Sequence, residues 1–401
     1  MTLWAGRVGA APAPEVWAFL RARDAELLPY DLEGTRLHAR RLEAAGLLSA
    51  AELAEVERRL AAITAGDLEE ADEDVHSAIE RLLGEVGRKI HAGRSRNDQV
   101  AAALRLYVAD ACREAEEALR GFVHAVLDRA AEEAETPMPG YTHLQRAIPV
   151  TVGHHLLAWV EMLERDRERF RFAGAQARPS PLGAGALAGS TLPLPPPPEP
   201  MRNSIDAVAD RDFALDYLYA CALLFAHLSR IGEELVLWTT SEFGFARLPE
   251  EAATGSSMMP QKLNADVAEL ARGKAGTAIG RLAGLLATVK SLPLAYDRDL
   301  QEDKAPVFAA RADVAGALAA LAVLVRGLAF DRERLAAAAA DPLLRATDAA
   351  EALVREGVPF RDAHERVAAQ VRAGTFEAPP AADRGIDAEA AVAAARERWA
   401  A

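Results

Sequence analysis

The segment from residue 254 to residue 264 brings together several groups that could share acid–base chemistry. It reads Thr-Gly-Ser-Ser-Met-Met-Pro-Gln-Lys-Leu-Asn, so hydroxyls, a cation and an amide lie in one short stretch. Gly255 lets the backbone turn, and Pro260 keeps the segment out of the helix expected to follow. A serine acts as a base only when a positive charge or backbone N–H groups stabilise its alkoxide, and Lys262 and the loop amides could do this. We interpret the segment as a catalytic loop, with an ordinary polar surface loop as the alternative.

Length and composition indicate a folded protein of two or three domains. The chain has 401 residues, of which 51% are hydrophobic and 26% charged, a balance typical of globular proteins. The formal net charge of -14 argues against binding to nucleic acid or to an anionic membrane, because both require a positively charged surface. A small anionic substrate is compatible with this charge, since Arg94-Ser95-Arg96 forms a local basic cluster.

Other sequence features bear on compartment, membrane and cofactor. Cys112 and Cys221 lie in apolar helical patterns, so we expect buried free thiols and a reducing cytoplasm. The first residues show no secretory signal, and the longest uncharged stretch, 179–198, contains too many prolines for a membrane helix. Histidine pairs at helical spacing, CxxC and GxGxxG are all absent from the sequence, so we expect neither a metal nor an organic cofactor.

Helical periodicity dominates the chain and predicts an all-α protein. Strand patterns are nearly absent. One apolar seam, with spacings that alternate between four and three, consists of Tyr217, Cys221, Leu224, Leu228, Ile231, Leu235 and Trp238. Long helices are predicted at about 97–135, 150–177, 203–241, 264–290 and 303–326.

These five helices are expected to form a bundle that covers itself by oligomerisation; the alternative is a monomeric bundle with polar outer faces. We expect three domains: an N-terminal helical domain at 1–91, a central long-helix domain at 92–336 and a small C-terminal helical domain at 337–401. Two polar linkers, 90–99 and 136–145, are expected at helix N-termini, where N–H groups and the helix dipole favour carboxylates or phosphates.

Taken together, these segments resemble the aspartase and fumarase superfamily and, in detail, its argininosuccinate lyase family. The GSSxMPxKxN pattern within 254–264 marks the superfamily. Gln261, the sequence GRSRNDQ at 93–99 and the sequence LQEDK at 300–304 are similar to the argininosuccinate branch. Further matching segments are spread over nearly the whole chain, at 31–35, 139–145, 180–189, 206–213 and 294–296.

The resemblance implies cleavage of argininosuccinate to arginine and fumarate, the last step of arginine biosynthesis, without metal or organic cofactor. It implies a homotetramer whose central domains form a bundle of twenty helices, with each site built by three chains. Ser256 would take the proton from carbon, and Lys262 and Asn264 would stabilise the doubly charged carboxylate intermediate. His143 would act as the acid, with Glu269 holding its ring in one tautomer. The substrate-binding residues implied are Thr35, Asp74, His76, Arg96, Asn97, Thr142, Tyr296, Gln301 and Lys304.

One departure and two alternatives accompany this interpretation. Leu263 and Ala265 stand where the family usually has lysine and proline, so we expect a more mobile loop. Another fumarate-forming lyase, acting on adenylosuccinate or aspartate, is an alternative against which Gln261 and Gln301 argue. A catalytically silent relative is the second alternative, and the joint presence of the four catalytic candidates argues against it.

Overall fold

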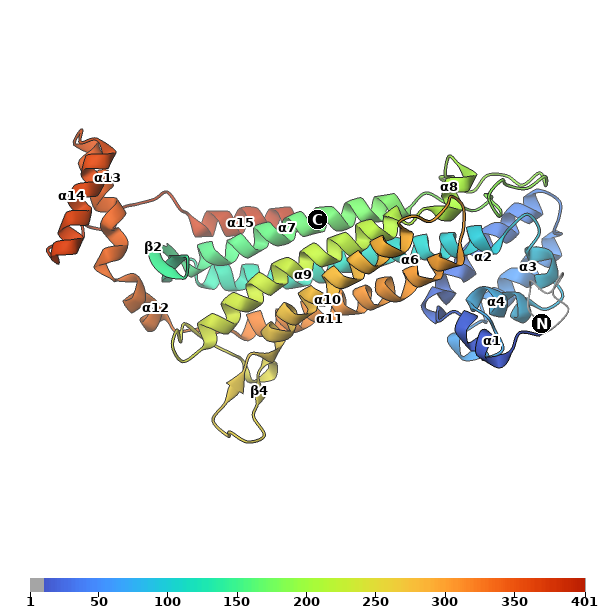
Figure 1. Ribbon diagram of the computed structural model, residues 1–401, viewed down its shortest axis with the longest axis horizontal. Helices are drawn as coiled ribbons and strands as arrows, with labels where there is room; N and C mark the ends of the chain where they lie inside the picture. Colours follow the sequence, from blue (N-terminus) through green and yellow to red (C-terminus); the bar gives the residue numbers. More distant parts are fainter. Residues whose placement is uncertain (1–10, 401) are drawn as a thin grey trace. The chain divides into compact units, whose positions relative to one another are not determined.

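Helices dominate the protein, which is described here by a computed structural model for residues 11–400 (Figure 1). In this described part, the strands are short and form two-stranded antiparallel sheets. The predicted all-α fold is therefore confirmed, with small hairpins added at the loops. Cys112 and Cys221 are both buried and free, as their apolar surroundings predicted.

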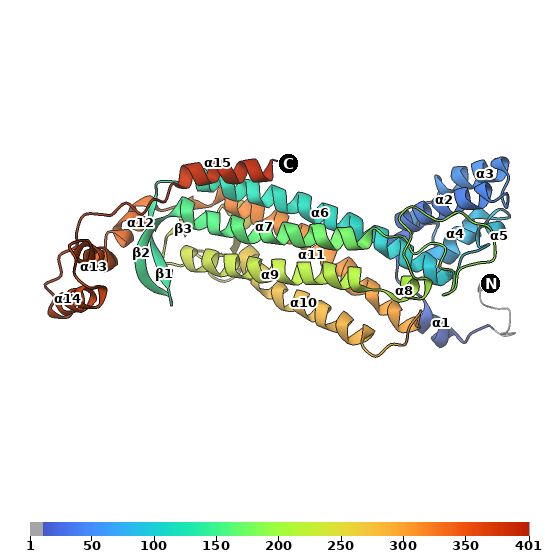
Figure 2. The ribbon, with the colours of Figure 1, turned by 90° about the horizontal axis from the view of Figure 1, so that it is seen from above.

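Five long helices correspond to the predicted ones, and one of them is interrupted. They are α6 (Arg96–Glu132), α7 (Val152–Ala177), α9 (Asp212–Thr239), α10 (Asp266–Val289) and α11 (Lys304–Gly327). The helix predicted at 203–241 was wrong as a single rod, because a short helix α8 (Ser204–Ala209) precedes α9. The Asp210 carboxylate accepts the N–H of Asp212 at 2.8 Å, which caps α9 and ends α8. Figures 1 and 2 show α7 and α9 running side by side.

The predicted apolar seam of α9 is buried along its whole length. Its seven members, from Tyr217 to Trp238, are all at most 4% exposed. Spacings of four and three keep these side chains on one face of the helix, so their burial follows directly from the periodicity.

The chain divides into two compact units, and each long helix contributes a part to both. Unit 1 comprises Met1–Glu116, Arg167–Leu223 and Gly276–Val314. Ser49 caps one of its short helices in a capping box with Glu52. The other elements of unit 1 are α1 (Pro14–Leu20), η1 (Ala25–Leu27), α2 (Leu28–Ala44), α3 (Ala50–Leu60), η2 (Ala65–Asp67), α4 (Val75–Leu83), α5 (Gly87–Ile90), α8 and η4 (Arg298–Asp303).

Unit 2 comprises Glu117–Asp166, Leu224–Ala275 and Ala315–Ala401. Its strand pairs are β1 (Pro137–Thr142) with β2 (Gln145–Thr151), β3 (Ala246–Arg247) with β6 (Ala329–Phe330), and β4 (Thr254–Gly255) with β5 (Leu263–Asn264). Its further helical elements are η3 (Glu250–Ala252), α12 (Arg332–Ala339), η5 (Pro342–Arg345), α13 (Ala346–Arg355), α14 (Phe360–Ala373) and α15 (Ala388–Trp399). Helix α15 returns to α7 and α6, where Arg398 pairs with Glu164 at 2.9 Å and Arg396 with Asp128 at 2.7 Å (Figures 1 and 2). Both units cut across the long helices, so they do not test the expected division at 91 and 336.

The linker at 136–145 differs from its prediction as a segment at a helix N-terminus. It forms most of the β1–β2 hairpin, in which Thr142 pairs with Gln145. His143 and Leu144, the two residues of the turn, have φ of 56° and 57°. Two central residues at positive φ match the twist of a two-residue hairpin, and this tertiary pairing outweighs the weak strand propensity of the segment.

The stretch 298–327, which contains η4 and α11, meets the length and hydropathy criteria of a membrane span. Its most apolar window has a mean hydropathy of 1.8, and 39% of that window is buried. One such helix is weak evidence for a span, because a core helix of a helical bundle meets the same criteria.

Candidate active site

A cavity of about 320 Å³ in unit 1 collects most of the residues expected to bind substrate. Its volume lies in the range of roughly 300–1,000 Å³ that is usual for ligand pockets. Four separate stretches of chain, around residues 22–24, 73–76, 91–100 and 296–304, supply its wall. The predicted residues that line it are Asp74, His76, Arg96, Asn97, Tyr296, Gln301 and Lys304.

Two helix starts place polar side chains at this cavity. Asp74 is the N-cap of α4, and its carboxylate accepts the N–H of Ser77 at 2.8 Å. The same carboxylate pairs with Arg96, the first residue of α6. Asn97 follows, and its side-chain amide donates to the Ala186 carbonyl at 3.2 Å. These bonds anchor both helix ends and fix the orientation of the polar groups.

A buried carboxylate holds His76 at the cavity wall. The His76 Nδ1 lies 2.9 Å from Asp31 Oδ2, and both side chains are 1% exposed. Gln99 donates to both oxygens of Asp31, each at 2.9 Å. Burial opposes the protonation of His76, but the nearby carboxylates of Asp31, Asp74 and Asp24 together outweigh it and raise the pKa of His76. A protonated His76 would keep a ring N–H available to a ligand, because its Nε2 has no hydrogen-bond partner among the described residues.

The stretch 296–304 supplies the opposite wall. Burial raises the pKa of Tyr296, with the Asp303 charge adding to the effect, so its phenol stays neutral. The Gln301 amide donates to the Leu20 carbonyl at 3.3 Å. The Lys304 ammonium lies 2.8 Å from Asp303 Oδ1 and is nearly buried.

Several residues that line the cavity were not predicted from the sequence. Asp24 is 4% exposed, its Oδ2 has no hydrogen-bond partner among the described residues, and burial raises its pKa. Arg298 pairs with Glu73 at 3.0 Å, and both line the cavity. Arg298 could have been found from its place between Tyr296 and Gln301, whereas no local pattern marks Asp24. His91 and Ser95 also line the cavity.

Thr35 was expected in the substrate pocket and is placed behind it. Its side chain is fully buried and its hydroxyl accepts from Arg94 Nη1 at 3.0 Å. Thr35 is absent from the cavity lining. In this arrangement it supports the buried Arg94, and direct contact with substrate stays a prediction.

The loop that contains Ser256 forms a short hairpin in unit 2. Thr254 pairs with Asn264 where β4 meets β5. The Ser256 Oγ accepts the backbone N–H groups of Met258 and Met259 at 3.2 and 3.0 Å. Donors aimed at this oxygen would stabilise an alkoxide, as a serine base requires. The Lys262 side chain, in the same loop, is exposed.

The tip of the β1–β2 hairpin carries His143. Both Thr142 and His143 are exposed there. Glu269 is exposed on the first turn of α10, and no hydrogen bond or ion pair joins it to His143 within the described chain. The expected pairing of the two stays a prediction for an assembly of chains.

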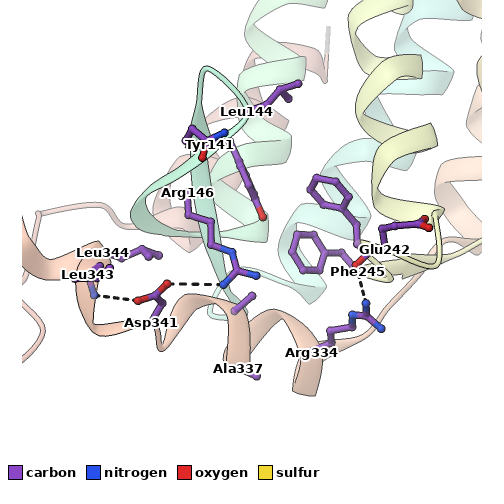
Figure 3. A pocket seen from close by; sticks show the side chains of 13 residues that line it. Tyr141, Leu144, Arg146, Glu242, Phe245, Arg334, Ala337, Asp341, Leu343 and Leu344 are labelled. Carbon is purple, nitrogen blue, oxygen red and sulfur yellow. Dashed lines mark hydrogen bonds and ion pairs between the residues drawn. The ribbon is translucent and has the colours of Figure 1, made fainter. Parts of the chain in front are cut away.

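A second cavity, of about 750 Å³, lies beside this hairpin in unit 2. Its wall contains the aromatic cluster of Tyr141, Phe243 and Phe245, with ring centroids 5.4 to 6.5 Å apart. Figure 3 shows the Arg146 guanidinium directed at Asp341, 3.9 Å away. Tyr141 and Leu144 flank the two predicted residues of the tip, so the cavity borders the expected acid.

The predicted site is thus divided between the two units. Unit 1 holds the substrate cavity, and unit 2 holds Ser256, Lys262, Asn264, Glu269, Thr142 and His143. Among residues 11–400 there is no cluster of three or more histidine, cysteine, aspartate or glutamate side chains suited to a metal ion. The groups present can bind anions, accept a proton from carbon and donate a proton to a leaving nitrogen.

Known proteins resemble this chain over nearly all of its length. Residues 12–280 match the family described as Lyase, and residues 343–393 match the family described as Argininosuccinate lyase C-terminal. An argininosuccinate lyase from Frankia casuarinae is 52% identical over 388 residues, which cover 92% of this chain and 83% of the relative. Another from Halorhodospira halophila is 47% identical over 393 residues, covering 93% and 84%.

Solved structures of related lyases have a similar fold. The crystal structure of EDDS lyase in complex with formate has a TM-score of 0.80 at 29% identity, over 98% of this chain and 90% of that one. A class II fumarase from Schistosoma mansoni shares the fold, with a TM-score of 0.75 at 15% identity over 89% and 88%. The resemblance seen in the motifs is therefore confirmed, and this chain belongs to the argininosuccinate lyase family, whose members are carbon–nitrogen lyases.

Proposed function

We propose that the chain cleaves argininosuccinate to arginine and fumarate by β-elimination, without metal or organic cofactor. The observation that carries the proposal is the convergence of seven predicted substrate residues, from separate stretches, on one cavity of unit 1. Basic groups at that cavity, such as Arg96, Arg298 and Lys304, suit carboxylates, and the Oδ2 of Asp24, which has no hydrogen-bond partner among the described residues, suits an ammonium. A substrate with carboxylates and an amino-acid end fits this set.

Ser256 is the proposed base of the elimination. It takes a proton from the carbon beside a carboxylate, and the N–H groups of Met258 and Met259 lower the cost of its alkoxide. Lys262 and Asn264 stabilise the extra negative charge that develops on that carboxylate. His143 donates a proton to the departing guanidinium as the carbon–nitrogen bond breaks. Glu269 orients the His143 ring.

We further propose that the sites are shared between the chains of a homotetramer. Helix α6 begins at Arg96 and has 37 residues, so it is about 55 Å long. Arg96, at its start, and His143, beyond its end, cannot both reach one small substrate from a single straight helix. Parts of several chains must therefore meet at each site. On this proposal the central domain, 92–336, supplies five helices from each chain to a bundle of twenty.

The surface of α10 supports a contact between copies. Leu270, Ile279 and Leu286 are 62%, 54% and 49% exposed. Between them lie glycines with open space where a Cβ would stand: Gly273, Gly276, Gly280 and Gly284. Bare glycines let another helix approach closely, and a monomer would leave these apolar side chains in water. A cytoplasmic location is inferred from the two buried free thiols.

The test is the appearance of fumarate, followed by its ultraviolet absorbance, from argininosuccinate, adenylosuccinate and aspartate in parallel. Release of fumarate from argininosuccinate in marked preference to the others is expected. Preference for adenylosuccinate or aspartate would move the chain to another branch of the superfamily. Activity on none of the three would identify a silent relative.

A further inference from the structure

A line of three buried charges ends at the substrate cavity of unit 1. It runs from Arg211 through Asp303 to Lys304, and only Lys304 lines the cavity. We infer that Arg211 and Asp303 are positioning residues, which hold the Lys304 ammonium in place and keep its positive charge available to a substrate carboxylate. The inference rests on the proposed function and adds two residues to its binding site.

The geometry of the line leaves each group little freedom. Asp303 is fully buried, Arg211 is 2% exposed and Lys304 is 4% exposed. Asp303 Oδ2 accepts from Arg211 Nε, and its Oδ1 accepts from Lys304 Nζ at 2.8 Å. The carboxylate therefore uses one oxygen for each cation. Burial opposes the ionisation of Asp303, but the charges of Lys304 and Arg211 outweigh it and lower the pKa of Asp303.

Charge counting explains why a second cation is needed. A buried Lys304–Asp303 pair alone would carry no net charge, so it would attract a carboxylate weakly. Arg211 neutralises Asp303 from its far side, which leaves one net positive charge on the line. Because the line is buried, that charge is poorly screened and acts mainly on the cavity.

The backbone around Arg211 is arranged for this contact. The sequence pattern predicted a continuous helix here, yet α8 ends at Ala209 and α9 begins at Asp212. Within the break, Arg211 Nη1 donates to the Asp210 carbonyl at 2.8 Å. A local departure from helical propensity is expected where function requires it.

The line also costs stability, which argues against a purely structural role. Arg211 Nη2 is buried and has no hydrogen-bond partner among the described residues. An unsatisfied buried donor is destabilising, and well-packed apolar side chains would often serve a core as well as an ion pair. Placement of a charge at the cavity accounts for keeping the three groups.

Substitution of each member tests the inference, with argininosuccinate binding measured by titration calorimetry in the Ser256→Ala background, in which binding is expected to persist while turnover is lost. Arg211→Gln should raise the dissociation constant about tenfold or more, because one buried charge several ångströms away is lost. Arg211→Lys keeps the charge and should recover most of the affinity. Arg311→Gln is the matched control, since it breaks the Arg311–Asp110 pair, which joins α11 to α6 away from the cavity, and its affinity should stay unchanged.

Asp303→Asn gives a second readout through pH. Lys304 then keeps its burial and a like charge at Arg211 but loses its carboxylate, so its positive charge is less well stabilised. Binding should therefore weaken more between pH 7 and pH 9 than in the parent. The difference from the parent is the readout, because other ionisable groups face the same cavity: Asp24, Glu73, Asp74, His76, His91, Arg96, Tyr296 and Arg298.

The outcomes separate the inference from the proposed function. Unchanged affinity in Arg211→Gln, or equal losses in Arg211→Gln and Arg311→Gln, would overturn the inference. If Arg211→Gln does not fold, an Asp303→Asn pH profile parallel to the parent's would overturn it. Failure of the unsubstituted chain to release fumarate from argininosuccinate would instead refute the proposed function, since calorimetry needs no turnover.

Discussion

At the scale of single residues, the hydrogen bonds of Ser256 bear most directly on its proposed role as a base. Its oxygen accepts two backbone N–H groups from the loop that follows it, Met258 and Met259. A hydroxyl in this position is already surrounded by the donors that an alkoxide needs. The proposed base and the groups that would stabilise it therefore lie within a few residues of one another in the chain.

Ser256→Ala should lower kcat by about a thousandfold or more while leaving the fold intact, because a transition-state role is removed and the binding groups remain. Fumarate release at saturating argininosuccinate measures this, with circular dichroism as the check of folding. The neighbouring Ser257→Ala is the comparison, and it should retain far more activity. Near-normal turnover in Ser256→Ala would rule out Ser256 as the base.

The Asp31–His76 pair makes the stability of the protein depend on pH. The pKa of His76 is raised by Asp31 despite burial, so its contribution is full below about 6.5 and is lost as pH rises through the folded pKa. Burial alone would raise the pKa of Asp31, but His76, Arg94 and Gln99 together outweigh burial and lower it. Its contribution is full above about 3.9 and is lost as pH falls through the folded pKa.

Asp31→Asn should therefore reduce stability most between about pH 4 and pH 6.5, by about 3–5 kcal/mol, with a smaller reduction near pH 9. Urea-unfolding midpoints of the parent and the variant at pH 5.5 and pH 9 measure this. Asp110→Asn breaks a pair with Arg311 that contains no histidine, so its effect should be equal at both values. Equal effects of Asp31→Asn at both would contradict the assignment.

At the scale of elements, the β1–β2 hairpin holds the proposed acid in a costly turn. His143 and Leu144 both have positive φ, a conformation that costs an L-residue roughly 1–2 kcal/mol. Leu144 is also 69% exposed, so burial contributes little in return. Such strain in a short, well-paired hairpin is consistent with a fixed position for His143.

Leu144→Gly should stabilise unit 2 by about 0.5–1 kcal/mol, because glycine adopts positive φ freely and this gain exceeds its added entropy in the unfolded chain. Gln145→Gly, one residue further in β2, should destabilise by a similar amount. Urea unfolding of the two variants measures both signs. Loss of stability in both would show that the turn at Leu144 is unstrained.

At the scale of the whole molecule, we propose that the site is shared between chains. The substrate cavity belongs to unit 1, whereas Ser256 and His143 belong to unit 2. The exposed apolar side chains and bare glycines of α10 offer a surface by which copies could associate. Association would then both cover these residues and complete the sites.

Complementation between inactive variants tests the shared site. His143→Ala and Ser256→Ala chains, unfolded, mixed equally and reassembled, should recover about a quarter of the activity, since each site draws its histidine and its serine from different chains with even odds. Each variant refolded alone is the control. Mixed tetramers as inactive as the parents would place both residues in one chain.

Local patterns in the sequence determined most of the helices. The seam from Tyr217 to Trp238 was recognisable because side chains three and four residues apart share one helix face, and all of it is buried. The motifs around Ser256 and Lys304 indicate the family by themselves, without knowledge of the cavity. These features depend on residues that lie near one another in the chain.

Tertiary structure decided the features that depend on distant residues. The break before α9 accompanies the bond of Arg211 to Asp303, 92 residues further along. Asp24 enters the cavity, and Thr35 is withdrawn behind it, through packing that no local pattern reports. Periodicity and propensity read neighbours within a turn or two of chain, whereas ion pairs and cavities depend on where remote segments meet.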